Sequence, residues 1–348
     1  LDDTPADRPR LVYPFPELPV RAQRLEVAPG VHWLRMPLPY HLNHINLWAL
    51  DEDGGFAVVD TGTRTEDVAA AWHELFAALP PGLVPTRVFV THMHPDHVGM
   101  AGWITRRFNV RLWMTRLEYL SCRVMAADTG REAPADAIAF YRHAGWGEAA
   151  VESYRVRFGN FGKHIHTLPD SFRRLHDGQW LRLGAHEWRV VVGSGHSPEH
   201  ACLHCPELGV LISGDQILPK ITPNVSVWFS EPFAEPLGQF LESIERFKSL
   251  PKDTLVLPSH KLPFRGLHTR LDELQRHHAA RLHEAHAACE TKPHTANEIL
   301  KIMFRRDLDH HQTGFALGES LAHLHHLVAR GLLVREIDAD GRVHFARA

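Results

Sequence analysis

The stretch Thr91-His92-Met93-His94-Pro95-Asp96-His97 carries the strongest signal in this sequence of 348 residues. It follows the apolar run Arg87-Val88-Phe89-Val90, which is typical of a strand. At a strand end, residues two apart point the same way, so His92 and His94 are positioned to share one metal ion. Asp96 and His97 then turn toward a second position as a helix begins. Imidazole and carboxylate ligands together suit Zn²⁺, with Fe or Mn as alternatives.

Because four possible ligands lie so close together in sequence, this motif indicates a metal site more specifically than a pair of alternate histidines does. Three imidazoles and a carboxylate clustered without a metal would carry a cost in charge and desolvation. His164-x-His166 has the alternate spacing but no partner motif around it, and we expect it not to bind metal.

Three further segments are apolar strands that end in a small-residue turn and one ligand type. We expect these ends to meet the first motif at a common edge of one sheet, where glycine lets the backbone come close. The segments are Val190-Val191-Val192-Gly193-Ser194-Gly195-His196, Val210-Leu211-Ile212-Ser213-Gly214-Asp215 and Leu255-Val256-Leu257-Pro258-Ser259-His260.

This ordered set resembles the metallo-β-lactamase superfamily over about residues 25–290, and Asp60-Thr61-Gly62 resembles the early strand-end aspartate of that family. The resemblance implies an α+β fold, an αββα sandwich of two mixed sheets covered by helices on both sides. It also implies two divalent metal ions and their ligands. Metal one would be bound by His92, His94 and His196, metal two by Asp96, His97 and His260, and Asp215 would bridge both. His200 matches a supporting position and is not expected to be a ligand.

Two adjacent metals imply a hydrolytic mechanism. They lower the pKa of a bound water toward about 7, and the bridging hydroxide attacks an electrophilic carbonyl. Asp96 is the predicted catalytic residue, because it is placed to orient the hydroxide and pass its proton on.

The chain divides into an extended arm at 1–24, a catalytic domain at 25–290 and a C-terminal module at 291–348. A helical, aromatic insertion is expected at about 116–170. In the module, helices at 296–306 and 315–330 precede a hairpin over 331–345, a pattern typical of a winged helix. The other expected elements are strands at 30–36, 46–50, 56–60, 188–192, 201–205, 210–213 and 254–257, helices at 65–79, 237–250 and 268–290, and an ordered loop at 219–236.

The composition is that of an ordinary globular protein, with 44% hydrophobic residues, 23% charged residues and a net charge of −3. This charge provides no general attraction to nucleic acid or acidic lipid. There are 28 histidines, most of which we expect to face solvent on helices, as in His277-His278 and the run from His323 to His326.

The four cysteines are expected to pack as buried thiols rather than to form disulfides. Cys202 and Cys205 lie three apart on a predicted strand and therefore point to opposite faces. We find no membrane-spanning stretch and no signal-peptide core, and a cytoplasmic enzyme is the expectation. Because the sequence does not begin with Met, we also expect further residues upstream.

Substrate contacts are less well determined by sequence. The insertion lies between two site loops, so its aromatics either form an apolar lid over the site or pack the core of the insertion itself. Tyr141 is the aromatic we select. Lys220 and Asn224, in the loop after Asp215, are candidates for contact with a substrate carboxylate or carbonyl.

The preferred function is hydrolysis of a thioester, ester or lactone with a small-molecule acyl substrate, similar to hydroxyacylglutathione hydrolases. An alternative is a metal-dependent endoribonuclease or phosphodiesterase, and another is a non-enzymatic metal-binding protein. From Glu290 onward there are eight Lys/Arg and eight Asp/Glu residues, so the C-terminal module lacks the basic surface that nucleic acid binding requires. The module is expected to pack on the core, line the cleft or form a homodimer interface.

Overall fold

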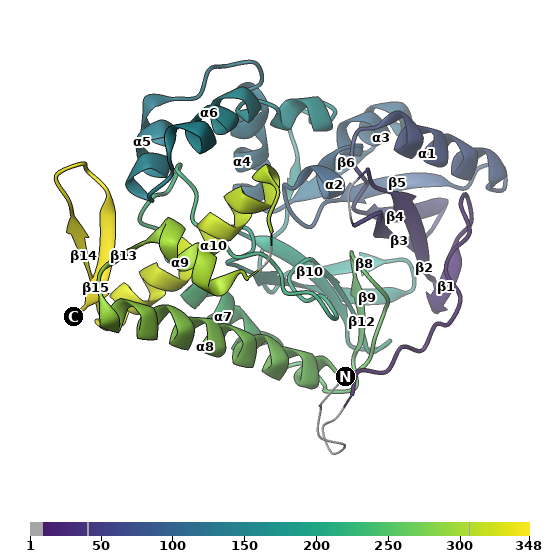
Figure 1. The fold of residues 1–348 in the computed structure, drawn as a ribbon. Coiled ribbons are helices and arrows are strands. Elements are labelled where there is room, and N and C mark those ends of the chain that lie inside the picture. Colours follow the sequence, from purple (N-terminus) through teal and green to yellow (C-terminus); the bar gives the residue numbers. More distant parts are fainter. Residues whose placement is uncertain (1–9, 40–41, 306) are drawn as a thin grey trace.

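Residues 10–39, 42–305 and 307–348 are described by a computed structural model (Figure 1). Residues 1–9 of the expected N-terminal arm lie outside the described residues. In the remainder of the arm, Val12 forms an isolated antiparallel bridge with Arg265.

A seven-stranded sheet forms the N-terminal half, and its strands are neighbours in chain order. The first four strands are antiparallel and the last three run parallel to the fourth, so the sheet is mixed. The strands are β1 (Leu25–Ala28), β2 (Val31–Pro37), β3 (His44–Glu52), β4 (Gly55–Val59), β5 (Val84–Phe89), β6 (Arg111–Met114) and β7 (Arg173–Arg174). Helices α1 (Glu66–Ala78), α2 (Pro95–Val98) and α3 (Ala101–Phe108) connect them.

The second sheet has five strands in the order β12-β11-β10-β9-β8 and is also mixed, because β11 and β12 are parallel. Its strands are β8 (Trp180–Leu183), β9 (His186–Gly193), β10 (His200–Cys205), β11 (Val210–Gly214) and β12 (Leu255–Pro258). Helices α7 (Pro236–Phe247) and α8 (Leu267–Thr291) follow β11 and β12.

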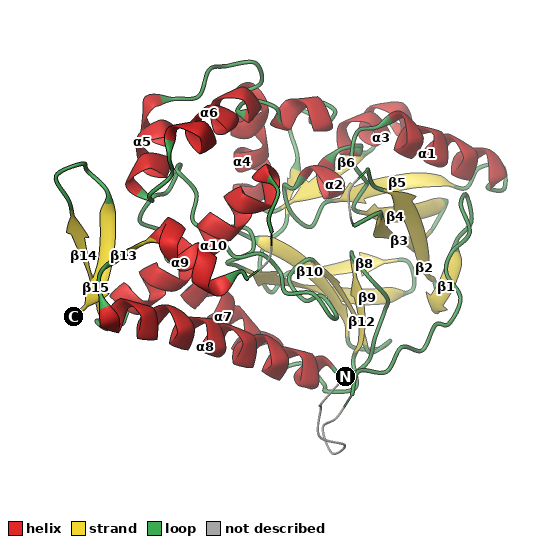
Figure 2. Cartoon of the chain, viewed as in Figure 1, coloured by secondary structure: helices red, strands yellow, loops and turns green. Residues whose placement is uncertain are grey.

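The two sheets pack face to face because their strands are apolar on both sides. Trp48 on β3 and Leu203 on β10 point into the shared core between the sheets. Leu47 points to the opposite side, toward α1 and α3, and Cys202 points toward α7 and α8. Helices therefore cover both outer faces (Figure 2). The predicted αββα sandwich of two mixed sheets is confirmed.

The stretch expected to be helical, about 116–170, forms a cluster of helices (Figure 1), whose buried side chains join the neighbouring hydrophobic cores. It contains α4 (Arg116–Ala127), α5 (Ala135–His143), α6 (Glu148–Arg157) and the short 3-10 helix η1 (Phe161–His164). Within it, the ring centroid of Tyr141 lies 4.4 Å from that of Trp146 and 4.4 Å from that of Tyr154. Tyr141 is thus packed among aromatic side chains of the insertion itself.

The C-terminal segment adds two helices and a small antiparallel sheet of order β13-β15-β14. Its elements are β13 (His294–Thr295), α9 (Ala296–Met303), α10 (His310–Ala329), β14 (Leu333–Ile337) and β15 (Val343–Arg347). Thr295 and Glu298 form a reciprocal capping box that starts α9. The predicted helices and hairpin are present, with α10 beginning at His310 rather than at 315.

The expectation that helix histidines face solvent is wrong for His278 of α8 and for His323, His325 and His326 of α10, whereas His283 of α8 is exposed. His278 and His323 are fully buried, and His325 is 5% exposed. The reason is that α10 is contacted by α7, α8 and α9 together, so it has little solvent-facing surface. The rule that polar positions on a helix mark the exposed face holds for surface helices and fails for an enclosed one.

The four cysteines are free and buried, as predicted. Cys202 packs on the helix side of its sheet and Cys205 in the core between the sheets. Within the described residues, no helix combines the length and the apolar character needed to cross a membrane.

Candidate metal centre

The predicted ligands meet at one edge of the sandwich, where strands of both sheets end. His92 lies just after β5 of the first sheet, whereas His196, Asp215 and His260 follow β9, β11 and β12 of the second. Backbone hydrogen bonds join the sheets there, from Ala201 N to Thr91 O at 2.8 Å and from Asn46 N to Ser259 O at 2.7 Å. The site is therefore built between two sheets, and not on the edge of one sheet as the sequence suggested.

The first group of converging side chains is His92, His94 and His196, whose ligand nitrogens all lie within 4.8 Å of one another. His92 Nε2 is 2.8 Å from His94 Nδ1 and 3.3 Å from His196 Nε2. Three imidazole nitrogens facing a common point form a typical binding site for a first-row divalent metal.

The second group is Asp96, His97 and His260. Asp96 Oδ2 lies 3.3 Å from His260 Nε2 and 3.7 Å from His97 Nε2. His260 is oriented from behind, because its Nδ1 donates to the backbone oxygen of His44 at 3.1 Å.

Asp215 lies between the two groups. Its Oδ2 is 3.8 Å from His196 Nε2, and 3.5 Å from each of His97 Nε2 and His260 Nε2. One carboxylate oxygen therefore faces ligands of both predicted metals, as a bridging residue must.

Two buried atoms of the site test whether a metal fits. His97 Nε2 and Asp215 Oδ1 have no hydrogen-bond partner, although both are buried. Such groups are costly to bury unpaired, and a cation between them would satisfy both. The donor set and the unpaired atoms fit two divalent metals bound in the arrangement predicted from sequence.

The electrostatics of the site also favour bound cations. Burial lowers the pKa of His94 to about 3, which leaves its imidazole neutral, the form that binds metals. Although burial opposes the charge, the carboxylates of Asp215 and Asp96 raise the pKa of His260 to about 10. The carboxylate side of the site thus attracts positive charge, which a divalent metal would supply in place of a proton.

Asp60 supports the first motif from behind. Its Oδ2 accepts from His97 Nδ1 at 2.8 Å, and its Oδ1 accepts from the backbone N–H of Thr91 at 2.8 Å. Asp60 has a φ of 60°, which is unfavourable for a residue with a side chain and is typical of functional sites. The strand-end aspartate expected from the resemblance therefore holds the first motif in place.

His200 and Gly214 are packed together beneath Asp215. His200 Nε2 accepts from the backbone N–H of Asp215 at 3.1 Å, so this imidazole holds the bridging residue in place. Gly214 has a φ of 52°, and a Cβ there would lie 2.4 Å from the His200 ring. Glycine is required because the backbone both turns and passes against an imidazole.

Glu118 is a supporting residue that the sequence reasoning missed. This buried side chain on α4 accepts from Met93 N at 2.9 Å and from Glu199 N at 2.8 Å, so it joins the loops that carry His94 and His196. Burial raises its pKa to about 7. The sequence carries no signal for it, because the leucines and valine of α4 suggest a different buried face.

The predicted substrate-contact residues have partners of their own. The backbone oxygen of Asn224 accepts a hydrogen bond from His196 Nδ1 at 2.8 Å. The ammonium of Lys220 lies 5.2 Å from the ring centroid of Tyr13. Tyr141 packs within the insertion, as described above. Whether any of the three contacts a substrate stays a prediction.

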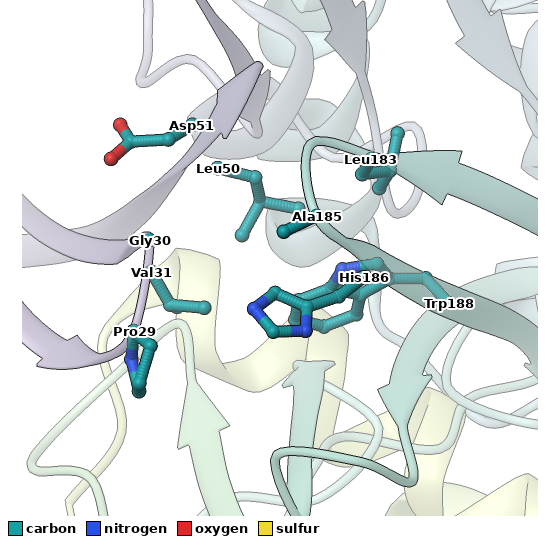
Figure 3. Close-up of a pocket in the computed structure, with 9 residues that line it drawn as sticks. All are labelled: Pro29, Gly30, Val31, Leu50, Asp51, Leu183, Ala185, His186 and Trp188. Atoms are coloured by element: carbon teal, nitrogen blue, oxygen red, sulfur yellow. The ribbon is translucent and has the colours of Figure 1, made fainter.

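A cavity of about 220 Å³ lies away from the ligands, between the start of β2 and the hairpin of β8 and β9 (Figure 3). Its lining is largely apolar, and the one histidine in it, His186, binds Glu207 through Nδ1 at 3.0 Å. None of the predicted ligands lines this cavity, so the chemistry is assigned to the strand-end site.

Comparisons with known proteins agree with this geometry. A sequence profile of the metallo-β-lactamase superfamily matches residues 42–260, and a profile described as the metallo-β-lactamase-like C-terminal domain matches residues 282–348. The first match includes all seven predicted ligands.

Two solved structures cover nearly the whole chain. A β-lactamase domain protein from Burkholderia ambifaria is 48% identical, with a TM-score of 0.89 over 97% of this chain and 98% of that one. A metallo-β-lactamase family protein from Thermus thermophilus is 31% identical, with a TM-score of 0.76 over 93% of this chain and 100% of that one.

Among curated proteins, a hydroxyacylglutathione hydrolase from Xanthomonas euvesicatoria is 25% identical over 216 residues, or 62% of this chain. The match spans 60% of the length of that relative. The similarity to this enzyme is therefore distant and partial.

Proposed function

The chain belongs to the metallo-β-lactamase superfamily as a metallohydrolase with a His/Asp metal site, and from this premise we propose that it hydrolyses a thioester, ester or lactone. The observation that carries the proposal is the position of Asp215 Oδ2, within 3.8 Å of ligand nitrogens from both groups. Two adjacent metals, most simply Zn²⁺, would supply an activated water at neutral pH and polarise the carbonyl oxygen.

The residues of the chain would perform the remaining tasks. Asp96 has a side chain that is 21% exposed, against 11% for Asp215, so it is the carboxylate with better access to an incoming substrate. In the proposed mechanism it orients the attacking water and accepts its proton at Oδ1, because Oδ2 faces the nitrogens of His97 and His260 that would hold metal two. Asp60 and Glu118 keep the loops fixed while the charge on the reacting atoms changes.

The acyl substrate class is supported by two observations. The distant relative is named for hydroxyacylglutathione, which is an acyl thioester. The C-terminal segment has equal numbers of acidic and basic residues, which is unfavourable for binding phosphodiesters.

Hydrolysis assays with purified protein test the proposal. We expect turnover of p-nitrophenyl esters, acyl-CoA thioesters or lactones that is lost with a chelator and restored by Zn²⁺, without cleavage of single-stranded RNA. RNA cleavage that is lost in Asp215→Asn, in protein without ester or thioester turnover, would show the substrate class to be wrong.

A further inference from the structure

The loop between Asp215 and α7 lies against α10, the long helix of the C-terminal segment. The backbone N–H of Val227 donates to Gly318 O at 3.1 Å. Farther along the loop, His325 Nδ1 donates to Ala234 O at 2.9 Å. One helix thus fixes the loop near its middle and at its C-terminal end.

Asn224, in this loop, connects α10 to a predicted metal ligand. Its backbone oxygen accepts from His196 Nδ1 at 2.8 Å, and its Nδ2 donates to Glu319 Oε2 at 3.2 Å. Ser226 Oγ donates to Asn224 Oδ1 at 2.6 Å, which fixes the amide orientation. A continuous series of hydrogen bonds therefore runs from Glu319 through Asn224 to His196.

The hydrogen bond from His196 Nδ1 to the Asn224 carbonyl fixes the orientation and the tautomer of this imidazole. Because Nδ1 donates to a carbonyl, a neutral ring carries its lone pair on Nε2, the atom that faces His92 Nε2 at 3.3 Å. A shift of the Asn224 carbonyl would rotate the ring and move Nε2 away from the common point of the first group.

Gly318 allows the helix to approach this loop. A Cβ at position 318 would lie 2.7 Å from the Cβ and from the Oγ of Ser226. Since such a distance is shorter than any ordinary carbon contact, an alanine there would push the loop away from α10.

We propose that α10 is part of the metal site, with Glu319 and Gly318 acting through Asn224 as positioning residues for His196. The inference rests on the proposed dinuclear site and deepens it, because it gives the C-terminal segment a role in binding metal one. Asn224 then acts through its backbone oxygen, independently of any contact with substrate.

Metal binding by α10 variants tests the inference without relying on activity. Competition with a chromogenic chelator measures the affinity of each of the two Zn²⁺ equivalents in Glu319→Ala, Gly318→Ala and Glu319→Gln. We expect the two alanine variants to bind one equivalent about 10–100-fold more weakly and the other with normal affinity. His196→Ala should weaken the same equivalent further. Glu319→Gln keeps an oxygen that accepts from Asn224 and should restore near wild-type affinity.

Ser320→Ala is the matched control, because among the described residues Ser320 Oγ donates only to Ala316 O, within its own helix. It should keep both equivalents. If Gly318→Ala does not fold, Asn224→Asp replaces it, since it removes the Nδ2 donor without changing side-chain size.

Wild-type affinity for both metals in the alanine variants would overturn the inference, as would equal weakening of both metals in step with a lower melting temperature. If the wild-type protein itself binds fewer than two equivalents, the dinuclear proposal fails instead.

Discussion

Buried histidines gather in two regions of this chain, and the regions differ in what surrounds their ring nitrogens. At the strand ends, imidazole nitrogens and carboxylate oxygens face a common space. A buried Nε2 without a hydrogen-bond partner occurs in both regions, at His97 and at His278, so the regions differ in the convergence of ligand atoms and in the nearby carboxylates. Between α8 and α10, His323 Nδ1 donates to Glu319 O at 2.7 Å and its Nε2 lies 3.2 Å from His278 Nδ1. Within the described residues, groups of three or more possible ligands occur only at the strand ends.

The comparison shows that a metal site depends on converging free nitrogens and on nearby negative charge, rather than on the number of histidines. Burial lowers the pKa of His278 to about 2 and of His323 to about 4, so the pair between α8 and α10 stays neutral. At the strand ends, Asp96 and Asp215 supply the charge that a cation would balance. The first region should therefore bind metal and the second should stabilise helix packing.

Replacing Asp215, the candidate bridging residue, should give the largest effect. A small effect would show that the strand-end histidines do not differ from those between α8 and α10 in binding metal. Asp215→Asn removes the negative charge shared by both groups, and we expect hydrolysis to fall below detection and the metal content to drop below two equivalents. Elemental analysis together with ester turnover measures this. Normal metal content with normal turnover would mean that Asp215 does not bridge.

Replacing Asp60, the residue that orients His97, should have a smaller effect on metal binding. Asp60→Asn replaces an oxygen that accepts from His97 Nδ1 with a side chain that can present an N–H there. We expect metal affinity to fall about 10–100-fold, as is typical when the partner of a metal-bound histidine is lost. Chelator competition measures this fall, and an unchanged affinity would show that the Asp60 contact does not matter for binding.

The stability contributed by the histidines between α8 and α10 should depend on pH and not on bound metal. Because the pKa of His278 is about 2 in the folded protein and about 6.5 in the unfolded chain, only the unfolded chain gains this proton as the pH falls below 6.5. The contribution of His278 to the free energy of unfolding is therefore fully present above pH 6.5. Below that pH it falls by about 1.4 kcal/mol per pH unit. The charged or titratable groups acting on His278 are His323, His277 and His326.

Denaturation of metal-free protein at pH 6.5 and 5 checks this difference. In His278→Gln the loss of stability over this range should be smaller by the contribution of one histidine, and two metals should still bind at pH 7. His283→Gln, at an exposed position on the same helix, is the control and should keep the wild-type pH dependence. Equal pH dependence in wild type and His278→Gln would contradict the assignment.

Most of the fold, and the convergence of the seven candidate ligands, could be predicted because they depend on local sequence and on its resemblance to a known family. Each segment that carries candidate ligands follows an apolar strand, and three of the four have a small-residue turn between strand and ligand; both features are visible without tertiary structure. Glu118 could not be predicted in this way. It is buried on α4, whereas Leu117, Leu120 and Val124 of the same helix are exposed, so the hydrophobic pattern indicates the wrong face.

Long-range contacts explain the other failures. The burial of His278 and His323 depends on α10 packing against three other helices. The contact between Asn224 and Glu319 joins residues 95 positions apart, and neither neighbourhood carries a recognisable motif. Such contacts follow from the way the chain folds back on itself, which local patterns do not specify.

The metal content of catalytically active protein tests the central claim most directly. Elemental analysis of purified enzyme, with ester or thioester turnover measured on the same sample, should give two equivalents of divalent metal per chain, and His278→Gln should give the same value. Clearly fewer than two equivalents in fully active enzyme would contradict the claim that His92, Asp96 and Asp215 belong to a dinuclear hydrolytic site.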